Sequence, residues 1–129
     1  MSNLLAGMRI LLLEDEFLIA MDVEQLCRDH GAANVMTLRD LEELERHTSL
    51  AGTDAAILDV MLGGASTLSF AHKLMQREIP FIFASGYTDL DEIFEAFPNI
   101  TVVSKPYAGD DLVEALAAAA GRLPASGSV

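Results

Sequence analysis

Short apolar runs alternate along the chain with segments in which apolar residues recur every three or four positions. The runs are four or five residues long, which is typical of strands buried on both faces of a parallel sheet. They occupy residues 9–13, 34–38, 55–58, 81–84 and 100–103. The helical spacing covers the segments near residues 17–30, 39–48, 68–79, 88–97 and 112–123. This alternation predicts an α/β domain with five strands and five helices.

Parallel strands joined by helices form right-handed crossovers, so we expect helices on both faces of a single sheet. A chain of 129 residues is enough for one domain with its own core. We expect this domain to span residues 8–123, preceded by an N-terminal extension over residues 1–7 and followed by a flexible tail over residues 124–129.

The charge of the chain narrows the possible partners. A formal net charge of −12 repels nucleic-acid backbones and anionic lipid surfaces, so neither direct nucleic-acid binding nor membrane binding is expected. The apolar stretches are shorter than the roughly 20 residues of a membrane-spanning helix. One cysteine, Cys27, cannot form an internal disulfide, and the start lacks the pattern of a secretory signal. A cytoplasmic protein is the expectation.

Polar residues follow the predicted strands where each strand ends. Glu14 and Asp15 come after the first strand, Asp59 after the third, Ser85 after the fourth and Lys105 after the fifth. In an open α/β sheet, ligands bind at the carboxyl ends of the strands. We therefore expect these side chains to share one pocket.

Three carboxylates in one pocket repel one another unless a cation lies among them. Mg²⁺ fits an all-oxygen site and also neutralises phosphate oxygens. Asp59 can then act as a nucleophile on phosphorus and form an aspartyl phosphate. Lys105 and the hydroxyl of Ser85 would bind the charge of the transferred group. The predicted chemistry is phosphoryl transfer.

The same residues carry a resemblance to a known family. The acidic pair Glu14–Asp15, the acceptor Asp59, the hydroxyl of Ser85 and the pair Lys105–Pro106 resemble the pattern of response-regulator receiver domains of bacterial two-component signalling. The likeness covers nearly the whole chain. The segments DVMLGG, PFIFASGY and SKPY are also similar to stand-alone receivers whose fourth strand reads Phe-Ala-Thr-Gly.

The resemblance implies a flavodoxin-like, doubly wound sheet with strand order 2-1-3-4-5. It implies that a histidine kinase or phosphotransfer protein phosphorylates Asp59, and that Ser85 and Lys105 assist. The metal ligands would be Glu14, Asp15, Asp59 and the main-chain carbonyl of Met61. Such a protein is a signalling protein rather than an enzyme, although it catalyses its own Mg²⁺-dependent phosphorylation and dephosphorylation. The downstream protein target is open, as is the choice between a monomer and a phosphorylation-linked dimer.

Two positions depart from the family pattern. Val102 stands where many receivers have an aromatic switch residue, so Tyr87 or Tyr107 is the candidate for that role. Glu14 replaces the more usual Asp, and its longer side chain would reach the metal through water.

Two other functions compete with the phosphorylation switch. One is a binding module that keeps the fold and works without phosphorylation, which the intact set of site residues disfavours. The other is a metal-dependent phosphohydrolase. Such enzymes usually carry a second acid two residues after the nucleophile, and Met61 occupies that position here.

Overall fold

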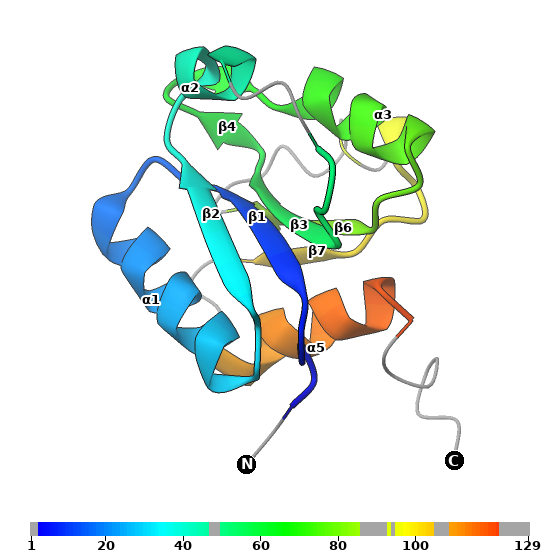
Figure 1. Ribbon diagram of the computed structural model, residues 1–129. Coiled ribbons are helices and arrows are strands. Elements are labelled where there is room, and N and C mark those ends of the chain that lie inside the picture. Colours follow the sequence, from blue (N-terminus) through cyan, green and yellow to red (C-terminus); the bar gives the residue numbers. More distant parts are fainter. Residues whose placement is uncertain (1–2, 47–49, 86–92, 94, 105–108, 122–129) are drawn as a thin grey trace.

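A central five-stranded parallel sheet organises the molecule (Figure 1). The computed structural model describes residues 3–46, 50–85, 93, 95–104 and 109–121. The sheet strands are β1 (Arg9–Leu13), β2 (Asn34–Leu38), β3 (Ala55–Asp59), β6 (Phe81–Ser85) and β7 (Val102–Ser104). The helices are α1 (Phe17–Asp29), α2 (Leu41–Arg46), α3 (Leu68–Gln76) and α5 (Gly109–Ala119), and β4 (Met61–Leu62) pairs with β5 (Ala65–Ser66) in a separate hairpin.

The strand order is β2-β1-β3-β6-β7, which confirms the predicted order 2-1-3-4-5 once the two hairpin strands are left out of the numbering. All four neighbouring pairs in this sheet are parallel. The fold is therefore the flavodoxin-like α/β fold expected from the sequence.

The central strands are apolar throughout because both faces of the sheet are covered. In β1, Ile10 and Leu12 belong to the apolar cluster on the side of α1 and α5, whereas Leu11 and Leu13 belong to the cluster on the side of α3. Alternate residues of a strand point to opposite faces, so an apolar run without alternation is what a two-sided core requires.

The helices lie in two layers (Figure 1). On one face, α1 contributes Val23 and Cys27 to the core, and α5 contributes Leu112 and Leu116. On the other face, α3 packs with the aromatic side chains of Phe81, Phe83 and Phe97, whose rings meet edge to face. At the amino-terminal side, Leu5 is fully buried, so part of residues 3–7 packs against the sheet.

Some boundaries differ from the sequence prediction. The fifth sheet strand is Val102–Ser104 rather than residues 100–103, and α5 begins at Gly109, three residues earlier than expected. Of the predicted helix over residues 88–97, only residues 93 and 95–97 are described, and Ile93, Glu95 and Ala96 are helical. In the described part of the chain, no helix is both long and apolar enough to cross a lipid bilayer.

The hairpin of β4 and β5 was not predicted. Gly63 and Gly64 form its two-residue turn with φ angles of 57° and 84°. Two successive residues at positive φ are the mark of a type I′ turn, which glycine adopts without steric cost. The segment forms a hairpin placed directly after β3.

Candidate metal and phosphoryl site

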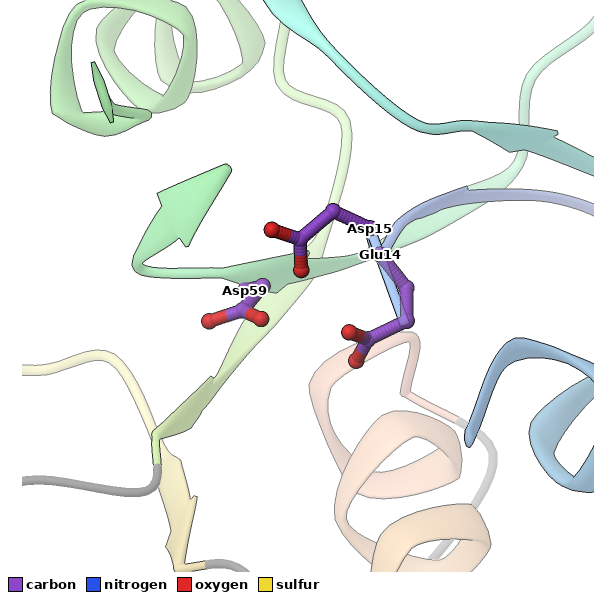
Figure 2. A group of neighbouring side chains, drawn as sticks. All are labelled: Glu14, Asp15 and Asp59. Atoms are coloured by element: carbon purple, nitrogen blue, oxygen red, sulfur yellow. The ribbon is translucent and has the colours of Figure 1, made fainter. Parts of the chain in front are cut away.

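Three carboxylates meet at the carboxyl edge of the sheet (Figure 2). Leu13 of β1 pairs in register with Leu58 of β3, so the residues that follow them, Glu14 and Asp59, leave the sheet side by side. Asp15 comes next in the chain. One carboxylate oxygen from each of the three acids lies within 4.8 Å of the others. The expected convergence of acids from the first and third strands is thus present.

Glu14 is the buried member of the cluster. Its side chain belongs to a residue only 2% exposed, and its Oε2 accepts a hydrogen bond from the backbone N–H of Glu16 at 3.1 Å. The backbone N–H of Glu14 donates to the carbonyl of Leu38 at 3.1 Å, which continues the pairing of β1 with β2. A buried carboxylate is costly unless a cation or strong donors compensate its charge. A cation among the three acids would lower the cost of this burial.

Asp15 is exposed, yet its position is fixed from across the site. The backbone N–H of Gly63 donates to Asp15 Oδ2 at 3.0 Å. This contact joins the loop after β1 to the hairpin after β3, 48 residues away in the sequence. A backbone donor carries no side-chain freedom of its own, so it holds the carboxylate in one orientation.

Asp59 ends β3 and is half-buried. Its Oδ1 accepts a long hydrogen bond of 3.4 Å from the backbone N–H of Met61. Its backbone carbonyl accepts a bond of 2.7 Å from the hydroxyl of Thr67. The acceptor candidate is thus constrained at both its side chain and its main chain.

Ser85 lies at the same edge as the acids. It ends β6 and is 5% exposed, and its neighbour Ala84 is in register with Asp59. On its other side Ser85 pairs with Ser104, the last residue of β7. Lys105 follows Ser104 in the sequence but lies outside the described residues, so its predicted role stays a prediction.

The position that replaces the aromatic switch is half-buried. Val102 packs against the cluster that contains Phe83 and Phe97. Tyr87 and Tyr107, the alternative switch candidates, lie outside the described residues. Which residue takes that role stays a prediction.

The donor set fits Mg²⁺. Carboxylate oxygens are the ligands that this ion prefers, and one or two carboxylates with retained waters satisfy it. The cluster Glu14, Asp15 and Asp59 holds no nitrogen or sulfur ligand that would favour zinc or copper. Met61 begins β4 two residues after Asp59, and its backbone carbonyl remains a predicted fourth oxygen ligand.

Sequence reasoning missed two residues at this site. The predicted elements include no hairpin around Gly63, although a Gly-Gly pair between two short segments is a known signal for a tight hairpin. Thr67 was not among the predicted site residues. In the structure Thr67 is the N-cap residue, although the hydroxyl of Ser66 does accept the N–H of Leu68 at 3.2 Å.

Known proteins are similar to this chain in sequence. The family model described as Response regulator receiver domain matches residues 10–117. The transcriptional regulatory protein PdtaR of Mycobacterium tuberculosis is 26% identical over 117 residues, which cover 88% of this chain; the chain spans 57% of the length of this curated relative.

Solved structures share the fold of this chain. SdrG from Sphingomonas melonis Fr1 is 37% identical and superimposes with a TM-score of 0.71, covering 92% of this chain and 98% of that one. The N-terminal signal receiver domain of a two-component response regulator from Bacteroides fragilis superimposes with a TM-score of 0.76 at 22% identity, covering 89% of this chain and 98% of that one. With a family match over most of its length, the chain belongs to the response regulator receiver domain family.

Proposed function

We propose that this protein is a response regulator that accepts a phosphoryl group on Asp59 from a histidine kinase or a phosphotransfer protein. The observation that carries the proposal is the convergence of Glu14, Asp15 and Asp59, with oxygens within 4.8 Å of one another, at the carboxyl edge of the sheet. Membership of the receiver family supports a place in two-component signalling.

The metal of the site is proposed to be Mg²⁺, held by Glu14, Asp15, Asp59 and the main-chain carbonyl of Met61. When bound, the ion neutralises the carboxylates and the oxygens of the transferred phosphoryl group. The N–H of Gly63 keeps Asp15 aimed at the cluster. Because Glu14 is buried, its attraction to a bound cation would be screened little by bulk water.

In the proposed reaction, a carboxylate oxygen of Asp59 attacks the phosphorus of the donor. A bond forms between this oxygen and phosphorus, the bond from phosphorus to the donor nitrogen breaks, and the nitrogen keeps the electron pair. Ser85 donates its hydroxyl hydrogen to a phosphoryl oxygen, and Lys105 supplies a positive charge. Such transfer depends on positioning and charge stabilisation rather than on acid-base steps.

Phosphorylation of Asp59 would then change how the protein binds others. The proposed readout is a phosphorylation-dependent contact with a downstream protein, as a stand-alone regulator in the cytoplasm, acting as a monomer or as a phosphorylation-linked dimer. A negative charge of −12 supports a protein target over direct contact with nucleic acid. A binding partner responds to phosphorylation only if its affinities for the phosphorylated and unphosphorylated protein differ. The target must therefore distinguish these two forms.

The experiment is phosphotransfer monitored by intact mass. Purified protein is incubated with a small-molecule acyl phosphate in Mg²⁺ and, in parallel, with EDTA. The proposal expects a mass increase of one phosphoryl group in wild type with Mg²⁺ only, and no increase in Asp59→Asn. A wild-type protein that stays unmodified with Mg²⁺, both with this donor and with phosphorylated histidine kinases, would overturn it.

A further inference from the structure

The hydroxyl of Thr67 is turned towards the backbone of the phosphoryl acceptor. Its Oγ1 donates to the carbonyl of Asp59 at 2.7 Å and lies 3.1 Å from the carbonyl of Val60. A hydroxyl carries one hydrogen, so the two carbonyls share it. The backbone N–H of Thr67 donates to the same Val60 carbonyl at 3.0 Å. Thr67 therefore binds two consecutive carbonyls that begin at the acceptor.

This use of Thr67 is unusual for its place in the fold. Thr67 is the N-cap residue of α3, where a threonine hydroxyl usually accepts a hydrogen bond from the first turn of the helix. Here no side-chain cap bond is formed by Thr67, and the hydroxyl of Ser66 accepts the N–H of Leu68 instead. The capping interaction has been replaced by a bond to the acceptor loop.

Thr67 is also a buried polar residue. Among the residues that the structure describes, the buried polar side chains belong to Glu14, Thr67 and Ser85. Two of them are predicted site residues, and Thr67, at 1% exposure, is the third. A buried hydroxyl must find a partner, and this one finds it in the loop that presents Asp59.

The bonds of Thr67 reach the acceptor side chain through one peptide plane. The carbonyl of Val60 and the N–H of Met61 belong to the same planar peptide group, so fixing the first fixes the second. That N–H points to Asp59 Oδ1 at 3.4 Å. The two peptide groups whose carbonyls Thr67 binds, Asp59–Val60 and Val60–Met61, immediately precede the Met61 carbonyl proposed as a metal ligand. Thr67 thus orients both a carboxylate and a backbone segment of the site.

We propose that Thr67 is a positioning residue that sets the affinity of the site for Mg²⁺ and the reactivity of Asp59. The proposal rests on the proposed function, because it assigns Thr67 a task within that site. Partners that orient metal ligands contribute strongly to metal affinity although they do not touch the ion.

The test compares Mg²⁺ binding by calorimetry in wild type, Thr67→Val and Thr67→Ser, with MgCl₂ as the only titrant. Valine keeps the shape of threonine and removes the donor, whereas serine keeps the donor. Thr67→Val should weaken Mg²⁺ binding by about tenfold, and Thr67→Ser should stay within about threefold of wild type. The yield of phosphoryl adduct, read by mass, should fall and recover in the same order.

A matched control removes a threonine hydroxyl bond elsewhere in the fold. The hydroxyl of Thr37 in β2 donates to Glu24 Oε2 in α1, away from the acceptor loop. Thr37→Val should lose stability, yet its Mg²⁺ affinity should stay within about twofold of wild type, because the lost hydroxyl bond joins β2 to α1 and does not reach the acceptor loop. Circular dichroism establishes that each variant is folded, and Thr67→Ala replaces Thr67→Val if the latter is unfolded.

The outcomes separate the two proposals. A folded Thr67→Val or Thr67→Ala that binds Mg²⁺ as tightly as a functional wild type overturns the role of Thr67 and leaves the proposed function standing. A Thr37→Val variant that weakens Mg²⁺ binding as much as Thr67→Val also overturns it, since general destabilisation would then explain the loss. A wild type that neither binds Mg²⁺ nor accepts a phosphoryl group overturns both proposals.

Discussion

The backbone N–H of Gly63 donates a hydrogen bond of 3.0 Å to Asp15 Oδ2, so the turn of the β4–β5 hairpin holds a carboxylate of the site. Thr67, which follows the hairpin in the sequence, bonds to the carbonyls of Asp59 and Val60, which precede the hairpin. The hairpin therefore connects two acids that the sequence places 44 positions apart, a separation that follows directly from their residue numbers 15 and 59. Its geometry is part of the site.

Replacing Gly63 with alanine should lower both stability and Mg²⁺ affinity. A side chain at a φ of 57° costs about 1 kcal/mol of unfolding free energy, and the strained turn would displace the N–H that holds Asp15. Gly7→Ala is the control, since its φ is 74° and its added Cβ meets no atom within 4 Å. Urea unfolding should show a similar loss in both, whereas calorimetry should show weaker Mg²⁺ binding in Gly63→Ala alone. Equal Mg²⁺ affinity in the two variants would contradict the role of the turn.

Mg²⁺ should stabilise the wild type against unfolding. At a free Mg²⁺ concentration of ten times the Kd, binding to the folded state adds about 1.4 kcal/mol to the free energy of unfolding. In metal-free buffer, Asp59→Asn should melt above wild type, because one of three mutually repelling carboxylates is gone. Thermal melts with EDTA and with MgCl₂ measure both effects. A melting temperature that Mg²⁺ raises equally in Asp59→Asn and wild type would place the ion elsewhere.

Glu78 offers a stabilising substitution far from the chemistry. It follows the C-cap of α3 with a φ of 57°, a conformation that favours glycine. Glu78→Gly should therefore raise the free energy of unfolding by about 0.5–1 kcal/mol. Arg77→Gly is the matched control: its φ of −93° gives glycine no advantage, so stability should fall. Urea unfolding measures both free-energy changes. A Glu78→Gly variant that is less stable than wild type would contradict backbone strain at residue 78.

Cys27 should behave as an inert core thiol. Burial raises the pKa of Cys27 from 9.0 to about 12, with Arg28 lowering it and Glu24 raising it. A raised folded-state pKa contributes stability that is fully present below pH 9 and is lost as the pH rises towards 12. The stability difference between wild type and Cys27→Ala should thus shrink over this range. A thiol reagent should label the native protein only after unfolding, and rapid labelling at neutral pH would contradict the burial.

The sequence predicts the sheet well because both faces are covered. Apolar runs such as 9–13 and 34–38 coincide with β1 and β2, and acids that interrupt a buried run mark the strand end where a ligand binds. The register of Leu13 with Leu58 then brings Glu14 and Asp59 together.

The hairpin was harder to predict. β4 and β5 have two residues each, too few to show a periodic pattern, so Gly63 and Gly64 alone carried the signal. The role of Thr67 was hidden for another reason. Serine and threonine are both favoured at helix N-caps, so the sequence does not distinguish Ser66 from Thr67 as the cap of α3. The structure shows that the hydroxyl of Thr67 is the one that bonds to the acceptor loop.

The most direct test of the account is the chemical mapping of the phosphorylated residue. Borohydride reduces an acyl phosphate to an alcohol, which converts a phosphorylated aspartate to homoserine in the peptide map. After incubation with a phosphodonor and Mg²⁺, the account predicts homoserine at position 59 and none when EDTA replaces Mg²⁺. Homoserine at another carboxylate, or at position 59 to the same extent without Mg²⁺, would contradict it.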